Sequence, residues 1–388
     1  WALILIACGG AMEATSTAPM PGTTATDLAA RAYVVGRDSE ELTVFDLRSQ
    51  ALIGRVATGG LTNHMAELSA DLGKIYVTSS DTNELVIVDA RTLTVSKRVP
   101  MGRHPTHLAL APTGDLAVMI EDDNAVAMVD TKSDELRATI PGFFSPHFIR
   151  FSRDGRTGYV ANIGAHHLTK VDLRTLRVTG HIALEGFRGP PNETPARDEG
   201  GFADAQVDHS GRLFAAHRAT GRVLIYDTLA DRSVGELQVG IGPWIAFAQH
   251  PFPNLPLRHL VPSFDDRAVA LIDADQNAVT AMLPGDAEAY GVNFSSRTPD
   301  RAFVMNRIRR DIAVVDTANG AVMKRIDVGG NTETAATSAD GSLIVAAVSS
   351  ANRVVFIDPS TGAIAKTFEG AGRYPWSVTI PNGQNYCH

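Results

Sequence analysis

The most constraining feature of the sequence is a short apolar run that ends in aspartate and recurs along the whole chain. The eight runs are LTVFD, LVIVD, VAMVD, LTKVD, VLIYD, VALID, IAVVD and VVFID, ending at Asp46, Asp89, Asp130, Asp172, Asp227, Asp273, Asp316 and Asp358. Successive aspartates lie 41 to 55 residues apart. One unit of this length cannot bury its own faces, so the recurrence predicts a stacked or closed array in which neighbouring units share a core.

The stretch from Phe143 to Asp172 shows the pattern of one complete unit. A proline precedes a short apolar strand, and a Ser-Arg-Asp-Gly turn leads to a second strand that contains Gly-Tyr-Val. A small polar loop then leads to the third strand, which ends in aspartate. With a fourth strand before the next unit, this is the length and pattern of one propeller blade. The sequence therefore predicts an all-β fold, an eight-bladed β-propeller.

The two ends of the repeat region predict how the ring closes. Residues 31–46 read as the second and third strands of a blade, with no first strand before them. Tyr374 to Ile380 reads as a first strand with no aspartate-ended strand after it. We expect this last strand to complete the first blade in a one-plus-three arrangement, because closure removes the open edges that promote aggregation.

The N-terminal region predicts export and a lipid anchor. Residues 1–7 read as the remnant of a signal peptide, since the apolar run is shorter than the ~20 residues of a spanning helix. The run from Leu5 to Gly9 resembles a bacterial lipobox, which implies lipidation of Cys8 and membrane attachment. The alternative is a signal-end cysteine of no consequence. Residues 8–26 then form a flexible tether and residues 27–388 the propeller.

Composition narrows the classes of partner. The net charge is −8 and the lysines are not clustered, so a nucleic-acid partner is not expected. The only cysteines are Cys8 and Cys387, so a lipidated Cys8 leaves no intrachain disulfide. Cys387 and His388 form either a copper ligand pair or an ordinary chain end.

Histidines gather on one predicted face of the disc. His64 and His147 each stand five residues before a turn serine, at the start of an innermost strand, and His107 is one step off that register. These three are predicted at the mouth of the central channel. The same face is predicted to carry His166, His167 and His217. Converging imidazoles are what a metal ion or a haem iron requires, whereas a solitary loop histidine is usually a solvated surface residue.

Arginines are predicted on the same face. The candidates for cofactor binding are Arg37, Arg103, Arg218 and Arg307. Guanidinium groups pair with carboxylates, so they suit a cofactor with several carboxylate arms; pairing between blades is the alternative. The widest interval contains Phe187 to Phe202, which we expect either to cover the channel as a lid or to be a surface loop.

The SxDGxxxYV and VxVID patterns resemble the YVTN-type bacterial propellers over nearly the whole chain. Eight blades with one-plus-three closure also look like the haem d1 propellers, namely the d1 domain of periplasmic nitrite reductase and its relatives in haem d1 biogenesis. The resemblance implies that His64, in Asn63-His64-Met65, would be the proximal ligand of the iron. It also implies that Thr379 to Gly383 belongs to the closing strand.

The sequence departs from the nitrite reductase in two respects. There is no Cys-x-x-Cys-His, so no covalent c-type haem is expected. The nitrite-binding histidines have no clear counterpart, and Pro243-Trp244 stands at the start of the sixth blade. What remains resembles the haem d1 biogenesis lipoprotein.

These observations predict a bacterial cell-envelope lipoprotein, in the periplasm or at the cell surface, that binds a redox cofactor at the channel mouth. The cofactor is haem d1 or its precursor, or else copper or another transition metal. Expected partners are periplasmic redox or cofactor-maturation proteins. The alternative is a non-catalytic YVTN surface propeller that binds protein or glycan.

Overall fold

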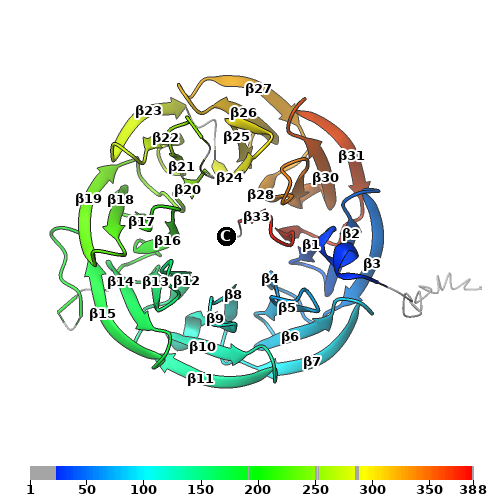
Figure 1. The fold of residues 1–388 in the computed structure, drawn as a ribbon, viewed down its shortest axis with the longest axis horizontal. Coiled ribbons are helices and arrows are strands. Elements are labelled where there is room, and N and C mark those ends of the chain that lie inside the picture. Colours follow the sequence, from blue (N-terminus) through cyan, green and yellow to red (C-terminus); the bar gives the residue numbers. More distant parts are fainter. Residues whose placement is uncertain are drawn as a thin grey trace, which may run out of the picture.

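The fold is an all-β, eight-bladed propeller. The computed structural model describes residues 23–190, 192–193, 195–249, 251, 253–284 and 288–386. In this part of the chain the strands form eight antiparallel sheets around one axis (Figure 1). The extreme N-terminus with Cys8, and the last two residues, Cys387 and His388, lie outside the described residues.

The first four blades run as follows. Blade 1 consists of β1 (Arg31–Gly36), β2 (Glu41–Asp46), β3 (Ala51–Ala57) and β32 (Pro375–Thr379). Blade 2 consists of β4 (Asn63–Leu68), β5 (Lys74–Ser79), β6 (Glu84–Asp89) and β7 (Thr94–Pro100). Blade 3 consists of β8 (Pro105–Leu110), β9 (Asp115–Ile120), β10 (Ala125–Asp130) and β11 (Glu135–Pro141), with the 3-10 helix η1 (Glu121–Asp123) after β9. Blade 4 consists of β12 (Pro146–Phe151), β13 (Thr157–Asn162), β14 (His167–Asp172) and β15 (Arg177–Ala183).

The other four blades repeat this order. Blade 5 consists of β16 (Phe202–Val207), β17 (Arg212–His217), β18 (Arg222–Asp227) and β19 (Arg232–Gln238). Blade 6 consists of β20 (Phe247–Ala248), β21 (Arg258–Ser263), β22 (Ala268–Asp273) and β23 (Ala278–Pro284). Blade 7 consists of β24 (Ala289–Ser295), β25 (Thr298–Asn306), β26 (Asp311–Asp316) and β27 (Val322–Asp327). Blade 8 consists of β28 (Thr332–Thr337), β29 (Ile344–Val348), β30 (Arg353–Asp358), β31 (Ala363–Glu369) and β33 (Gln384–Asn385), with η2 (Ser349–Ala351) after β29.

The recurrent turn residues have a direct structural role. After β6, Asp89 Oδ1 accepts hydrogen bonds from the backbone N–H groups of Arg91 and Thr92, both at 2.8 Å. In the Ser-x-Asp-Gly turn after β12, Ser152 Oγ donates to Asp154 Oδ1 at 2.6 Å. Gly155 has φ +68°, which glycine adopts without strain. Short polar side chains thus replace the missing strand partners of the turn backbone.

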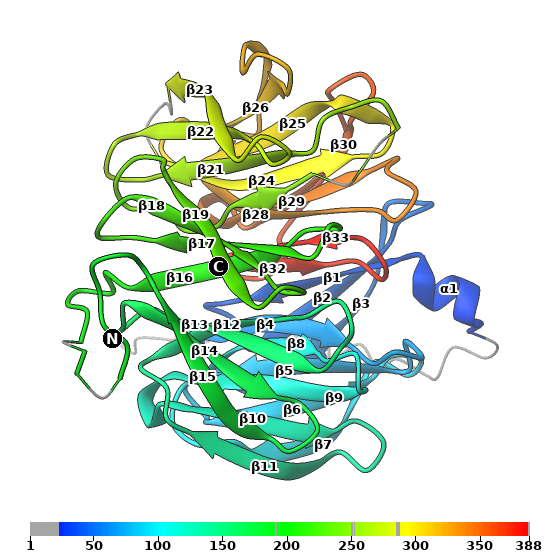
Figure 2. The same ribbon diagram turned by 60° about the vertical axis from the view of Figure 1, so that its left-hand side comes forward.

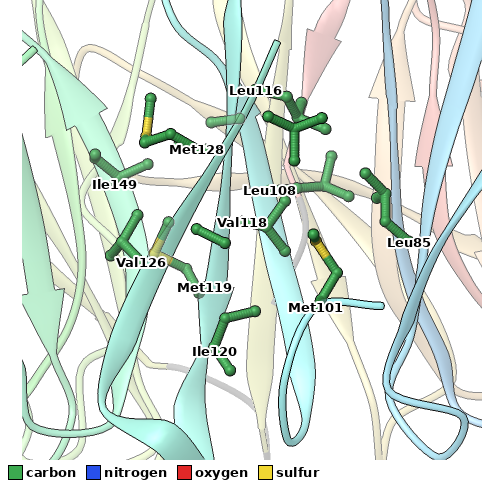
Figure 3. Close-up of a cluster of buried hydrophobic side chains, with 14 of the residues drawn as sticks. Leu85, Met101, Leu108, Leu116, Val118, Met119, Ile120, Val126, Met128 and Ile149 are labelled. Atoms are coloured by element: carbon green, nitrogen blue, oxygen red, sulfur yellow. The ribbon is translucent and has the colours of Figure 1, made fainter. Parts of the chain in front are cut away.

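The core lies between the blades. The third strand of a blade is buried, as in β10, while the outermost strand is largely exposed, as in β11. Figure 3 shows one cluster in which Leu85 of β6, Leu108 of β8, Met128 of β10 and Ile149 of β12 pack together. Because such clusters join neighbouring sheets, adjacent blades share their cores.

The chain ends meet in blade 1, where the sheet order is β3-β2-β1-β32. Val34 of β1 lies opposite Val378 of β32. The innermost strand of the first blade therefore comes from the C-terminal end of the chain.

A short helix, α1 (Ala25–Ala29), precedes blade 1 and projects beside its sheet in Figure 2. Thr24 and Asp27 form a capping box, and Leu28 is buried in the cluster that contains Tyr33. The sequence predicts a flexible tether that extends to residue 26, whereas residues 25 and 26 belong to this helix. The buried side chain of Leu28 packs the helix against the first blade. Among the described residues, no helix has the length and apolar character needed to cross a membrane.

Candidate metal centre at the channel mouth

Six aromatic and imidazole rings form a closed belt around the axis of the propeller. Each ring comes from a different blade, and each lies in or just before an innermost strand. In order around the axis, the members of this central belt are His64, His107, His147, Trp244, Tyr290 and Trp376. Neighbouring ring centroids lie 4.2–6.4 Å apart. The fold thus brings the three histidines predicted for the channel mouth into contact with one another.

β-Bulges at the start of the innermost strands aim the histidines at the axis. In the strand ladders, His64 falls between Asn63 and Ala66, His107 between Pro105 and Leu108, and His147 between Pro146 and Phe148; the pairing register shifts at each place. A bulge turns side chains away from the regular alternation of a strand. This explains how His107, one step off the register of the other two, still reaches both of them.

The strongest arrangement for metal binding in the described residues joins two belt histidines to a carboxylate. One ligand atom from each of His107, His147 and Glu121 lies within 4.8 Å of the others. His107 Nδ1 is 3.8 Å from Glu121 Oε1. The Nδ1 atoms of His107 and His147 are buried and have no hydrogen-bond partner among the described residues. Buried nitrogen atoms without partners are costly unless they bind something, and two imidazoles with one carboxylate form a typical transition-metal ligand set.

His64 occupies a different position in the group. Its Nε2 atom is 3.3 Å from Nε2 of His107, and its ring packs edge-on against Trp376. His107 therefore contacts His64 through Nε2 and faces Glu121 through Nδ1. If a metal ion bound Nδ1 of His107, His64 would be the hydrogen-bond partner of His107 Nε2. A partner on the second ring nitrogen commonly orients metal-binding histidines.

Burial favours the neutral form of the belt histidines. Burial lowers the pKa of His107 to about 3, and the positive charge of Arg150 adds to the effect. Burial and the neighbouring His107 likewise lower the pKa of His147 to about 3. The pKa of His64 also falls well below its usual value, mainly through burial. Neutral imidazoles offer the lone pairs that a metal requires.

Glu121 is the functional candidate that the sequence reasoning missed. It opens η1, directly after β9, and its side chain is 16% exposed. Thr106 Oγ1 donates a hydrogen bond to Glu121 Oε1 at 2.7 Å and so fixes the carboxylate beside His107. The available signal was the run Glu-Asp-Asp after a second strand, since the following loop lies on the histidine face.

Three of the four predicted arginines stack on belt aromatics. The guanidinium carbon lies 4.8 Å from the ring centroid for Arg37 over Trp376, 4.3 Å for Arg218 over Trp244, and 4.3 Å for Arg307 over Tyr290. One half of the belt thus carries imidazoles beside a carboxylate, and the other half carries aromatic rings covered by cations. Two of these cations also form ion pairs, Arg218 with Glu199 at 3.4 Å and Arg307 with the buried Glu333 at 2.9 Å, so their charges are partly neutralised.

The fourth predicted arginine, Arg103, lies elsewhere. Its side chain is 70% exposed and forms an ion pair with Asp123, with Nε 2.7 Å from Oδ1. It contacts η1 rather than the belt, because Asp123 and the Asp122 carbonyl oxygen bind its guanidinium group.

The other predicted metal ligands form a second, separate group. His166 Nδ1 is 2.9 Å from His217 Nε2, and His167 Nδ1 contacts Glu193 Oε2. His217 Nδ1 also contacts Thr220 Oγ1 at 2.9 Å. The structure therefore divides the six predicted histidines between two places. In the second group each histidine contacts a polar side chain, while His167 Nε2 is buried without a hydrogen-bond partner among the described residues.

The insertion from Phe187 to Phe202 contacts this second group. Phe187 stacks on His166 with a centroid distance of 4.4 Å, and Glu193 accepts a hydrogen bond from the His166 backbone N–H. Figure 1 shows most of the segment between β15 and β16 extending outward from the rim, beside β15 and β19. Of the two alternatives for this segment, the contacts of its described residues favour the surface loop, because Phe187 and Glu193 pack on His166 of blade 4.

The C-terminal residues cross the channel interior. Gln384 accepts a hydrogen bond from Phe294 N–H at 2.7 Å, and Tyr386 OH donates to Ala248 O at 3.1 Å. β33 pairs with β28 and lies near the centre of the ring in Figure 1. These contacts join blades 6, 7 and 8 across the axis.

Comparison with known proteins agrees with the fold. Residues 61–181 match the model of the YNCE-like beta-propeller family. The dihydro-heme d1 dehydrogenase NirN in complex with DHE gives a TM-score of 0.78 at 14% identity, covering 92% of this chain and 76% of that one. Apo AztD from Citrobacter koseri gives 0.63 at 10% identity, covering 90% and 96%. Hydrazine synthase from Kuenenia stuttgartiensis gives 0.55 at 15% identity, covering 84% and 92%.

No curated protein matches the chain. The family match covers less than half of the residues, and the structural neighbours have low identity, so the comparisons speak to fold and not to activity. The chain is an eight-bladed β-propeller that resembles the YNCE-like propellers in one stretch and the haem d1 dehydrogenase in its overall fold.

Proposed function

We propose that this propeller binds a transition-metal ion at the channel mouth through His107, His147 and Glu121. The observation that carries the proposal is the approach of one ligand atom from each residue to within 4.8 Å. Nitrogen and oxygen ligands of this kind suit zinc, copper, iron or cobalt. Three protein ligands leave coordination positions open toward a reactant, as catalytic sites do.

The belt supplies the surroundings that such a centre needs. His64 lies against Nε2 of His107, and Thr106 holds the carboxylate of Glu121. Arg37, Arg218 and Arg307 line the other half of the belt. The N–H donors of these guanidinium groups would orient an anionic reactant beside the metal in periplasmic redox or cofactor-maturation chemistry, although Glu199 and Glu333 already pair with Arg218 and Arg307.

The proposal also places the protein in the bacterial cell envelope, attached by a lipid on Cys8 and acting with periplasmic redox or maturation partners. The support for this part is the lipobox-like run from Leu5 to Gly9.

A tetrapyrrole of the haem d1 class is the second candidate. It is supported by the three arginines over flat aromatic rings, which suit carboxylate arms, and by the fold shared with a haem d1 dehydrogenase. The histidine arrangement fits it less well. His64 Nε2 faces His107 Nε2 at 3.3 Å, so His64 could bind a haem iron only if the two imidazoles separated. The donor set present therefore fits a metal ion better.

Titration of the purified full chain with Co²⁺, followed by calorimetry and visible absorbance, tests the proposal. We expect one ion per chain and an absorbance band typical of nitrogen and oxygen ligands. His107→Ala should weaken binding by at least about 100-fold, since loss of an outer-sphere partner alone costs 10–100-fold. Glu121→Gln should weaken it less, because the amide oxygen remains a neutral donor.

Two matched variants separate the alternatives. His209→Ala removes an exposed histidine from a turn on the opposite face and should leave the affinity unchanged. His217→Ala removes a member of the second histidine group; if it abolished binding and His107→Ala did not, the belt would not be the site. A haem d1 titration, in which a shifted Soret band disappears in His64→Ala, would favour the tetrapyrrole instead. Absence of both responses would leave the non-catalytic surface propeller.

A further inference from the structure

Glu121 has two oxygen atoms that face two different environments. Oε1 lies toward the buried side, 3.8 Å from His107 Nδ1. Oε2 lies toward the surface, 3.9 Å from His104 Nδ1. His104 Nδ1 is in turn 3.6 Å from Asp122 Oδ1. A single carboxylate thus connects an outer imidazole–carboxylate pair with the inner metal ligands.

Exposure falls steadily along this line of side chains. The exposed fraction is 58% for Asp122, 45% for His104, 16% for Glu121 and 1% for His107. All four carry atoms that bind divalent cations. These four side chains lead from solvent to the proposed centre. Neighbouring ligand atoms are close enough for one ion to contact two of the side chains at a time after small side-chain shifts.

The outer group, His104 and Asp122, is held in place by several hydrogen bonds around it. Arg103 N–H donates to Asp123 Oδ2 at 2.8 Å, and Arg103 Nη2 donates to the Asp122 carbonyl oxygen at 2.9 Å. Glu121 N–H donates to the His104 carbonyl oxygen at 3.2 Å, and His104 N–H donates to Asn83 Oδ1 at 2.9 Å. Hydrogen bonds therefore join η1 to the loop before β8, so the backbone of the fold fixes the positions of His104 and Asp122. This is also the role that the structure gives to Arg103.

A solvent-open depression adjoins the outer group. Its volume is about 440 Å³, and it is lined by Thr62, Ser80, Asp81, Asn83, Arg103, His104 and Asp122. Its two carboxylates favour a cation, and the opposing charge of Arg103 is neutralised by the ion pair with Asp123. A hydrated ion can reach His104 and Asp122 here without passing through the belt.

We propose that His104, Asp122 and the outer oxygen of Glu121 form a surface capture site that delivers a divalent metal ion to His107 and His147. The inference rests on the proposed function. Glu121 stays bound throughout, while His104, Asp122 and waters are exchanged for the two buried imidazoles. The exchange changes neither the oxidation state of the metal nor the covalent bonds of the protein, and the displaced waters return to solvent.

Stopped-flow mixing with Cu²⁺ tests the capture site. Trp244 lies 5.5 Å from His147 and Trp376 lies 6.1 Å from His64, measured between ring centroids, so an arriving paramagnetic ion will quench tryptophan fluorescence. In the double variant His104→Ala, Asp122→Asn we expect the association rate constant to fall on the order of tenfold, the scale of local electrostatic steering. Removal of bound metal by excess chelator should slow by the same factor. The equilibrium affinity and the stoichiometry should stay at the wild-type level, because the inner ligands and the Thr106 hydrogen bond to Glu121 are intact. At 3.9 Å from Glu121 Oε2, His104 Nδ1 is too far to hydrogen-bond that ligand.

Asp154→Asn and His209→Ala are the matched controls. Together they remove one carboxylate and one imidazole from turns on the opposite face, so the change in net charge is the same. Wild-type uptake in the controls and slow uptake in the capture-site variant would support the proposal. Equal rates in all three proteins, or equal slowing in both variants, would overturn it while leaving the inner centre in place. If the wild-type protein bound no metal, the proposed function itself would fail.

Discussion

Individual residues acquire their roles in the belt through local irregularities of the strands. His64 and His147 could be predicted for the mouth because each stands at a fixed distance before a turn serine. Glu121 carries no such mark, since it enters the site only because η1 follows β9. His107 reaches its neighbours through a bulge. The spacing of the repeat predicts residues at regular positions of the blades. It does not predict residues whose positions depend on a β-bulge or on a helix after a strand.

Glu67 is a second residue whose surroundings matter more than its place in the repeat. It lies on β4, three residues after His64, and its side chain accepts a hydrogen bond from Leu68 N–H at 2.9 Å. Burial raises its pKa from 4.5 to about 7, although Arg150 partly opposes the rise. Arg150 is already paired with Asp204, with Nη2 3.2 Å from Oδ2. The channel interior thus holds a carboxyl group that is not fully ionised at neutral pH.

This predicts a pH-dependent stability. The folded state holds the Glu67 proton more tightly than the unfolded state, so the contribution of this group to stability is complete below about pH 4.5. It is lost as the pH rises toward about 7. Glu67→Gln removes the ionisable group, so the melting temperature of the variant relative to wild type should rise across this range. Thermal melts at several pH values check this.

Glu135→Gln is the control, since Glu135 is exposed on the outermost strand β11. It should follow the wild-type pH profile. A Glu67→Gln protein with the same pH dependence as wild type would show that Glu67 ionises freely in the folded chain.

At the scale of strands and turns, the aspartate that ends each third strand organises the hairpin to the outermost strand. The same pair of backbone contacts recurs from blade to blade: Asp89, Asp130, Asp172 and Asp227 each accept from the N–H groups two and three residues later. The aspartate Oδ1 atom accepts hydrogen bonds from turn N–H groups that have no strand partner, which explains why an aspartate recurs at this position of the blades.

Asp89→Ala tests this element. The change leaves two backbone N–H groups without their acceptor, at a cost of about 0.5–1.5 kcal/mol for each hydrogen bond. We expect a lower melting temperature with the fold retained. Asp89→Asn keeps an oxygen in the Oδ1 position and should lose clearly less stability. Equal losses in both variants would mean that the negative charge, and not the hydrogen bonds, is what matters.

On the scale of the whole molecule, closure of the ring and the position of the C-terminal segment are linked. β32 supplies the innermost strand of blade 1, and the following residues cross the channel to blades 8, 7 and 6. The same segment therefore closes the sheet edge and contributes Trp376 to the belt. Folding of the ring and formation of the proposed site should occur together.

Two truncations separate these contributions. A chain that ends at Gly372 lacks β32, so β1 becomes an open edge and we expect soluble oligomers or aggregates. A chain that ends at Gly383 keeps β32 and loses only Gln384 to the end. It should remain monomeric and melt a few degrees lower, because buried contacts of Gln384 and Tyr386 are lost. Size-exclusion chromatography and circular dichroism distinguish the outcomes; monomeric behaviour of the shorter chain would show that closure does not depend on β32.

The sequence by itself determined the repeat and the number of blades, and it predicted that His64, His107 and His147 lie close together. These follow from local causes: alternation along strands, aspartate and glycine turn chemistry, and regular spacing. Tertiary structure alone separated His166, His167 and His217 from the belt. It also brought Glu121 beside His107, set Arg103 on η1 and stacked Phe187 on His166. Bulges and contacts between blades shift side chains by a few ångströms, and coordination chemistry depends on distances of that size.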